Sequence, residues 1–296
     1  MMPGMSHATR CRPEVEAFLH APSSAWGYVV HDGHSAAVID PALSLDTASG
    51  AVTAPVARDM VAFIKARGLV VEWLLETHAH ADHLTAAAWL KQRVGGRTAI
   101  GEGIREVQAA FSDLLDFEPD FAADGSQFDR LLDADERLAI GSLEARVVPT
   151  PGHTSDSVTY VIGDAAFIGD TLFMPDVGSA RCDFPGGDAR RLYASVRRLY
   201  ELPAATRVYV CHDYPPGGRD IRHETSVAEQ RQRNLHLHDG TAERDFVALR
   251  NARDAGLAVP ALLYASLQVN LRAGQLPPPA ANGRRYLKIP LSEAQP

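Results

Sequence analysis

The sequence is poor in cysteine and carries no excess of basic charge. Its 296 residues include three cysteines, Cys11, Cys182 and Cys211, an odd number at wide spacing that predicts neither a disulfide framework nor a Cys-x-x-Cys metal site. Aspartate and glutamate (37) outnumber lysine and arginine (29), which gives a formal charge of -8. This acidic balance argues against a nucleic acid or an anionic membrane surface as a partner.

Long apolar runs are also missing. No stretch approaches 18 uninterrupted apolar residues, and residues 1–7 lack the charged-then-apolar pattern of a secretory signal. We therefore expect no membrane association and a cytoplasmic location. The composition, 46% hydrophobic and 22% charged, is that of a folded globular protein. Its length fits two domains as well as one; we expect a single α/β domain over residues 1–296, with a core at about 20–222 and a helical and extended C-terminal part at 223–296.

Histidine is more informative than any of these absences. Five of the twelve histidines lie at the ends of apolar runs: His78, His80, His83, His153 and His212. Three of them fall in the segment Thr77–His83, which follows the apolar run Val70–Leu75 and precedes an alanine-rich stretch. Imidazole nitrogen and carboxylate oxygen suit zinc and iron. The His-x-His-x-Asp-His spacing therefore predicts a metal-binding loop in preference to a histidine-rich surface turn.

Hydrophobic periodicity around this loop predicts strands alternating with helices. Strands are expected at 25–30, 35–40, 70–76, 97–100, 143–148, 157–162, 165–168 and 207–210, and helices at 56–67, 86–94, 104–111, 188–199, 225–235 and 242–254. Each candidate metal ligand then lies at the end of a strand, where a rigid scaffold can hold it still. The role of residues 103–141 stays open.

Four motifs in order make the sequence resemble the metallo-β-lactamase superfamily. They are T-H-x-H-x-D-H at Thr77–His83, P-G-H-T at Pro151–Thr154, G-D-T-L-F at Gly169–Phe173, and a late strand-end histidine, His212. The resemblance extends over about residues 28–214. It implies an α/β fold, a four-layer αβ/βα sandwich with the metal site at one sheet edge, and here a helical C-terminal extension.

Two activities in that superfamily share these ligands. The first resembles the dinuclear-zinc hydroxyacylglutathione hydrolases (glyoxalase II). It would use one zinc on His78, His80 and His153, a second on Asp82, His83 and His212, and Asp170 as a bridge, so that a metal-bound hydroxide attacks a thioester. The second resembles the persulfide dioxygenases of sulfide oxidation. It would use one Fe(II) per chain on His78, His153 and Asp170, leaving positions for water, sulfur and dioxygen. His80, Asp82, His83, His212 and Asp183 would then orient the ligands and hold water.

Residues outside the ligand set favour the dioxygenase. Ala180–Asp188 resembles the R-x-D-F segment of that group, and Asp183 stands where glyoxalase II usually has a tyrosine. Cys211–Tyr214 is similar to its H-D-Y motif, and residues 125–129 and 287–290 resemble bacterial members. The resemblance implies that glutathione persulfide is oxidised with O2 and water to glutathione and sulfite. Thioester hydrolysis is the alternative.

Binding glutathione requires donors for its two carboxylates. Arg181 aligns with the basic residue that binds the glycyl carboxylate in glutathione-using relatives, and the Tyr214 hydroxyl is a second candidate. Each has a structural alternative: an ion pair with Asp183 or Asp188 for Arg181, and a core position for Tyr214.

The remaining histidines and cysteines receive structural interpretations. We interpret Cys182 and Cys211 as small buried residues, and His223, His236 and His238 as part of a solvated helix face. Dimers are common among the relatives, which makes a homodimer one option, but the sequence leaves the oligomeric state and the preferred thiol open.

Overall fold

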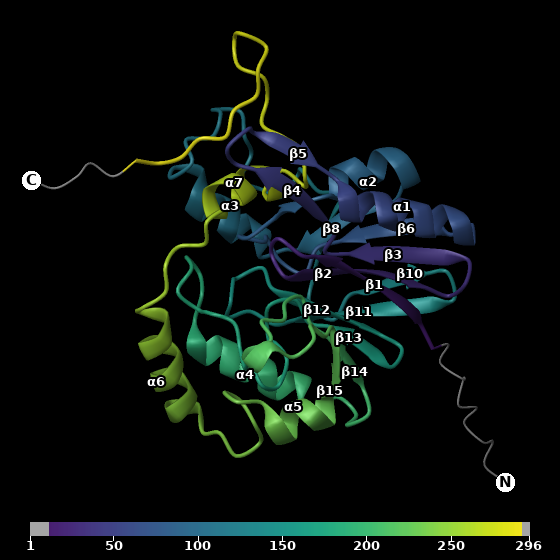
Figure 1. Ribbon diagram of the computed structural model, residues 1–296, viewed down its shortest axis with the longest axis vertical. Helices are drawn as coiled ribbons and strands as arrows, with labels where there is room; N and C mark the ends of the chain where they lie inside the picture. Colours follow the sequence, from purple (N-terminus) through teal and green to yellow (C-terminus); the bar gives the residue numbers. More distant parts are fainter. Residues whose placement is uncertain (1–11, 292–296) are drawn as a thin grey trace, which may run out of the picture.

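Two six-stranded sheets form the centre of the protein in a computed structural model that describes residues 12–291 (Figure 1). Cys11 lies outside the described residues. The first sheet has the order β1 (Glu14–His20), β2 (Ala25–His31), β3 (Ser35–Ile39), β6 (Val70–Leu75), β8 (Arg97–Gly101) and β9 (Arg130–Leu132). The second has the order β10 (Arg137–Ile140), β11 (Leu143–Pro149), β12 (Val158–Ile162), β13 (Ala165–Phe167), β14 (Arg207–Tyr209) and β15 (Glu224–Ser226).

Helices cover the outer faces of the two sheets. They are α1 (Pro55–Arg67), α2 (Ala87–Val94), α3 (Ile104–Ser112), α4 (Ala189–Leu199), α5 (Val227–Arg233), α6 (Glu243–Asp254) and α7 (Leu263–Asn270), with a short 3-10 turn, η1, at Pro216–Gly218. In Figure 1, α1 and α2 lie beyond the first sheet, whereas α4 and α5 lie beyond the second. A small sheet, β5 (Ala51–Thr53), β4 (Ala42–Asp46) and β7 (Leu84–Thr85), lies beside them.

Three apolar clusters hold the four layers together. Tyr28 and Val30 of β2 point into the cluster between the two sheets, while Val29 between them packs against residues of α1 and α2. This alternation follows from the two-residue period of a strand whose faces are both buried. A further cluster joins the outer face of the second sheet to α4 and α6, with Leu192 and Phe246 at its centre. The expected four-layer αβ/βα sandwich is confirmed.

Local signals in the sequence set the ends of several helices. Gly68 ends α1 in the left-handed conformation (φ 63°), which glycine adopts without steric cost. Asp188, the expected N-cap of α4, accepts hydrogen bonds from the backbone N–H groups of Arg190 (2.7 Å) and Arg191 (2.9 Å). Both helices begin and end close to their predicted bounds.

Several elements differ from those expected from the sequence. The strands β1, β4, β5, β7, β9 and β10 and the helix α7 were not expected, and β15 followed by the shorter α5 stands where one helix was expected over 225–235. Since β15 pairs with β14, the second sheet extends past residue 222. Figure 1 shows α7 beside α3, and an apolar cluster joins Leu267 of α7 to Ile104 of α3. The described part of the chain holds no helix long and apolar enough to cross a membrane.

Candidate metal centre

Three loops bring the predicted ligands together where the two sheets meet. His78 follows β6 of the first sheet, His153 follows β11 of the second, and Asp170 follows β13. One donor atom from each of these three residues lies within 4.8 Å of the others. All three side chains are buried or nearly so. Residues separated by up to 92 positions in the chain (78 to 170) thus form one compact group.

Hydrogen bonds to the ring nitrogens determine which atom of each histidine faces the group. His153 Nδ1 lies 2.7 Å from the carbonyl oxygen of Arg181, so Nδ1 must carry the proton. The Thr77 hydroxyl donates to Asp40 and therefore accepts from His78 Nδ1, at 3.0 Å. Both rings consequently keep a lone pair on Nε2, the arrangement that a metal ligand needs.

Asp40 anchors the histidine loop from the end of β3. Its carboxylate accepts from the Thr77 backbone N–H (2.7 Å) and hydroxyl (2.9 Å), and its Oδ1 lies 3.1 Å from His80 Nε2. Asp40 adopts a left-handed conformation (φ 49°), a strained state for a residue other than glycine. A Cβ at position 27 would lie 2.7 Å from the Asp40 carbonyl oxygen, so the close approach of β2 requires Gly27.

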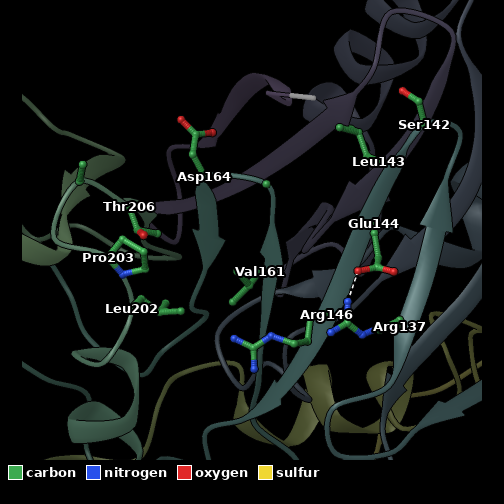
Figure 2. Close-up of a pocket in the computed structure, with 12 residues that line it drawn as sticks. Arg137, Ser142, Leu143, Glu144, Arg146, Val161, Asp164, Leu202, Pro203 and Thr206 are labelled. Carbon is green, nitrogen blue, oxygen red and sulfur yellow. Dashed lines mark hydrogen bonds and ion pairs between the residues drawn. The ribbon is translucent and has the colours of Figure 1, made fainter. Parts of the chain in front are cut away.

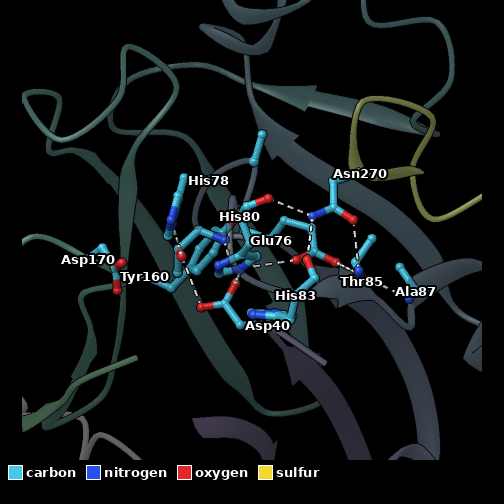
Figure 3. A network of polar contacts seen from close by, with 12 residues as sticks. Asp40, Glu76, His78, His80, His83, Thr85, Ala87, Tyr160, Asp170 and Asn270 are labelled. Carbon is cyan, nitrogen blue, oxygen red and sulfur yellow. Dashed lines mark hydrogen bonds and ion pairs between the residues drawn. The ribbon is translucent and has the colours of Figure 1, made fainter. Parts of the chain in front are cut away.

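His80 faces two carboxylates. Its Nε2 lies 3.1 Å from Asp40 and 3.5 Å from Glu76, and Figure 3 shows its ring between these side chains. Burial alone would lower the pKa of His80, but the charge of Asp40 raises that pKa well above its usual value. Among the described residues, a donor atom of His80 lies within 4.8 Å of donor atoms of Asp40 and Cys211, and another such group joins His80 to Asp82 and His83. No such group in this part of the chain joins His80 to His78 and His153.

Several buried donor atoms beside the group lack a hydrogen-bond partner within residues 12–291. These atoms are His83 Nε2, His212 Nε2, both ring nitrogens of His80, and Asp170 Oδ1, although His80 Nε2 lies within ion-pair distance of Asp40 and Glu76. His212 donates through Nδ1 to the Ser23 carbonyl (3.2 Å), and its Nε2 lies 3.5 Å from Asp82 and 3.6 Å from Asp170. Buried polar atoms left unpaired cost free energy. A metal cation supplies the missing partner, so this donor set fits a metal site.

Asn270 of α7 holds the histidine loop from the other side. Its Nδ2 donates to the carbonyl oxygens of His80 (2.8 Å) and His83 (2.9 Å), and its Oδ1 accepts from the Thr85 N–H (2.8 Å). Figure 3 shows these three contacts. Neither Asn270 nor Asp40 was expected at the site from the sequence, although Asp40-Pro41 marks the end of the expected strand 35–40.

A pocket of about 420 Å³ opens directly onto the group. Its floor includes Asp82, His153 and Asp170, and its walls include Phe173, Val177, Phe184, Tyr214, Leu257 and Pro260. Tyr214 is 49% exposed and stacks on His212 with ring centroids 5.6 Å apart, so the core alternative for Tyr214 is wrong. The lining of the pocket therefore combines apolar and aromatic side chains with the acidic and histidine side chains of the metal group and with several cationic or polar side chains described next.

Two of the arginines that line this pocket are already paired. Arg181 forms two 2.6 Å hydrogen bonds with Asp183 and one with the carbonyl of Ala258, as its structural alternative predicted. Arg250 pairs with Asp254. Arg253 lines the same pocket and, within residues 12–291, forms no ion pair with a carboxylate. Arg253 was not expected in the pocket, because no local sequence feature distinguishes it from other helix-surface arginines.

His236 contradicts its predicted solvated position, because it is 5% exposed and also lines the pocket. Here α5 ends at Arg233, and the Asn234 side chain accepts from the N–H groups of His236 and Leu237, turning both inward. His236 Nδ1 accepts from the Ser179 N–H at 3.0 Å. Burial, followed by the nearby charges of Arg253 and Arg250, lowers the pKa of His236 to about 4.

Cys211 adjoins the metal group, because its sulfur lies within 4.8 Å of donor atoms of Asp40 and His80 and of Asp170 and His212, whereas Cys182 belongs to no such group among the described residues. Cys182 and Cys211 are buried, as predicted, and burial raises the pKa of the Cys182 thiol to about 12. A cavity of about 560 Å³, shown in Figure 2, is bounded by Leu143, Val161 and the segment 202–206. It shares no lining residue with the metal group.

Comparisons with known proteins match this fold and site. A family model described as "Metallo-beta-lactamase superfamily" matches residues 21–212. The chain is 51% identical to a probable metallo-hydrolase of Burkholderia pseudomallei (strain 1710b), over 94% of this chain and 98% of that protein. It is 46% identical to "Glyoxylase B2" of Dictyostelium discoideum, over 95% and 98% of the two chains.

Persulfide dioxygenases are also among the similar proteins. The mitochondrial persulfide dioxygenase ETHE1 of Homo sapiens is 30% identical over 87% of each chain. The crystal structure of ETHE1 from Myxococcus xanthus aligns with a TM-score of 0.70 and 28% identity, over 88% of this chain and all of that one. Because the family model covers more than half of the sequence and the sandwich carries all four motifs, the chain belongs to the metallo-β-lactamase superfamily.

Proposed function

We propose that the protein is a persulfide dioxygenase that uses one Fe(II) per chain to oxidise glutathione persulfide. The observation that supports this proposal most strongly is the grouping of His78, His153 and Asp170 within 4.8 Å of one another. Two histidines and one carboxylate are the ligand set of non-haem Fe(II) oxygenases. In the same part of the structure, His80 turns its Nε2 to Asp40 and Glu76 and groups apart from His78 and His153.

The overall reaction balances without a further reductant. Dioxygen accepts four electrons as the terminal sulfur of the persulfide becomes sulfite, water supplies the third oxygen, and the S–S bond breaks to release glutathione and two protons. The metal, when bound, supplies the electron transfer between sulfur and dioxygen. The remaining tasks, which are binding, orientation and exclusion of water, fall to the side chains of this chain.

Each of these tasks has a candidate residue. The Arg181 carbonyl and the Thr77 hydroxyl fix the tautomers of His153 and His78. Phe173 and Phe184 line the pocket beside Asp170 and limit the access of water to the reacting sulfur. For a glutathione carboxylate, Arg253 is a better candidate than Arg181, whose guanidinium is already paired with Asp183. The Tyr214 hydroxyl remains a further candidate donor in this proposal.

A dinuclear-zinc glyoxalase II-like thioesterase is the second candidate. Two observations favour it: the unpartnered Nε2 atoms of His83 and His212, which are positioned as if for a second ion, and the higher identity to "Glyoxylase B2" than to ETHE1. Two zinc ions would be held by His78, His80 and His153 and by Asp82, His83 and His212, with Asp170 near both, and they would supply Lewis-acid activation of water for thioester hydrolysis.

Metal content and substrate turnover separate the two candidates. The purified protein should contain about one iron per chain for the dioxygenase and about two zinc for the hydrolase. Protein loaded anaerobically with Fe(II) should consume oxygen when glutathione persulfide is added and should produce sulfite. Absence of oxygen uptake, together with hydrolysis of S-lactoylglutathione by the zinc-loaded protein, would replace the first proposal with the second.

A further inference from the structure

An arginine outside the metal group joins the two loops that form one wall of the pocket. Arg219, just after η1, donates two hydrogen bonds to Asp213 (2.6 and 2.8 Å) and two to Asp176 (2.6 and 2.7 Å). Its guanidinium therefore binds two carboxylates bidentately at once. Charge-assisted pairs of this geometry are among the strongest and most directional hydrogen bonds in proteins.

The two aspartates belong to different ligand-bearing loops. Asp176 lies in the loop 171–179, which starts directly after Asp170 and is closed by a bridge between Leu172 and Ser179. Asp213 lies between His212 and Tyr214 and is fully buried. It also accepts from the Arg222 N–H at 2.7 Å. The Arg219 side chain, 23% exposed, thus bridges a buried carboxylate and one that is 44% exposed.

Both loops contribute aromatic side chains to the pocket. Phe173 comes from the first loop and Tyr214 from the second, and their rings pack edge to face with centroids 5.4 Å apart. Tyr214 stacks in turn on His212, at 5.6 Å. The contact between Phe173 and Tyr214 forms part of the wall that rises from Asp170. A change in the spacing of the two loops would therefore change the width of the pocket next to the metal group.

We infer that Arg219 is a positioning residue that sets the width of the substrate pocket by fixing loop 171–179 to loop 211–214. Arg219 touches neither the ligands nor the pocket, so it acts through Phe173 and Tyr214. Lysine at this position keeps the charge but loses the planar fork that binds both carboxylates. Asparagine at position 176 removes only the exposed carboxylate and leaves the buried Asp213 paired with Arg219.

The kinetic test compares Arg219→Lys and Asp176→Asn with the wild-type enzyme. Both variants should raise KM for the glutathione substrate roughly fivefold while kcat and metal content stay nearly unchanged, as expected for a loss of about one strong hydrogen bond in substrate positioning. Arg207→Lys is the matched control, because Arg207 pairs bidentately with Asp164 at a site outside the pocket. An unchanged KM in Asp176→Asn, or an equal change in Arg207→Lys, would overturn the inference.

The kinetic test rests on the proposed function. A second measurement does not depend on it. Hydrogen exchange followed by mass spectrometry should show faster exchange in segments 171–179 and 211–219 of both variants, and no such change there in Arg207→Lys. If neither glutathione substrate is turned over but exchange rises in these two segments, the proposed function fails and the role of Arg219 stands. If exchange in both segments stays at the wild-type rate, Arg219 does not join the loops. Should Arg219→Lys not fold, Asp176→Asn alone decides between these results.

Discussion

Single side chains of the metal group differ in the donor atoms that they leave for a metal. His78 and His153 each have Nδ1 committed to a hydrogen bond and Nε2 left for a metal, and Asp170 contributes the anionic donor. His80 differs, because its Nε2 already faces Asp40 and Glu76. These three histidines and one aspartate are all buried, yet they differ in their capacity to bind a metal.

Alanine substitutions test this distinction. For the Fe(II) enzyme proposed above, we expect His78→Ala, His153→Ala and Asp170→Ala to lose iron, because each removes one of three converging donors. His80→Ala should keep its iron but lose activity, since its ring supports the loop that holds His78. Iron content measured by mass spectrometry after anaerobic loading distinguishes these outcomes. Equal iron loss in all four variants would add His80 to the coordination set.

A second prediction concerns the arginines of the pocket. Arg253→Ala should raise KM for the glutathione substrate roughly tenfold, because a guanidinium with no carboxylate partner in the described chain is lost from the pocket. Arg181→Ala should alter stability more than KM, since it leaves Asp183 and the Ala258 carbonyl without their donor. Steady-state kinetics and urea denaturation of both variants measure the contrast. A larger KM effect for Arg181 would restore the assignment suggested by its place in the R-x-D-F segment.

His236 gives a prediction about pH. Its pKa of about 4 in the folded protein lies below the ordinary value of 6.5, because burial and Arg253 disfavour the charged ring. The unfolded chain therefore binds the proton first as pH falls, so stability is kept above pH 6.5 and is lost between 6.5 and about 4. His236→Asn, which keeps an acceptor for the Ser179 N–H, should flatten this part of the curve. Urea denaturation between pH 7 and pH 4 measures it, with the exposed His238→Asn as the control that should follow the wild type.

At the scale of secondary-structure elements, contacts distant in sequence complete the site. The ligand loops could be predicted because each follows an apolar strand directly in the sequence. One short segment therefore contains both the end of the strand and its ligands. Asp40 acts on a residue 37 positions away, and Asn270 acts on one 185 positions away. No local pattern marks Asn270, and Asp40-Pro41 marks only the end of a strand, without indicating the contact that Asp40 makes. The same limit explains why α7, a short helix that packs on the histidine loop, was missed.

The contribution of α7 can be tested through Asn270. Asn270→Ala leaves three buried backbone groups, on His80, His83 and Thr85, without their partner, which should lower the free energy of unfolding by about 3 kcal/mol. It should also weaken metal binding, because the loop that carries His78 becomes less rigid. Ser266→Ala is the matched control on the same helix, since the Ser266 hydroxyl has no hydrogen-bond partner among the described residues. Similar stability for the two variants would show that Asn270 does not hold the loop.

At the scale of the whole molecule, the metal group joins the two sheets. His78 comes from the first sheet, whereas His153 and Asp170 come from the second, and the apolar cluster between the sheets lies directly beneath them. The strand ends that carry these ligands meet only when both sheets have formed and packed. The site is therefore a product of the complete sandwich and of no single element.

Metal binding should accordingly stabilise the complete sandwich. A ligand that binds only the folded state stabilises it by about 2.7 kcal/mol at a hundredfold excess over Kd. For a protein of 296 residues that corresponds to a rise in Tm of roughly 4 °C. Calorimetry with and without a chelator should show this difference in the wild type but not in His153→Ala, which lacks one of the two ligands from the second sheet. Because the three ligands come from both sheets, the protein should unfold in one transition whose Tm the metal raises. A separate transition at lower temperature in the metal-free protein would show that the two sheets unfold independently.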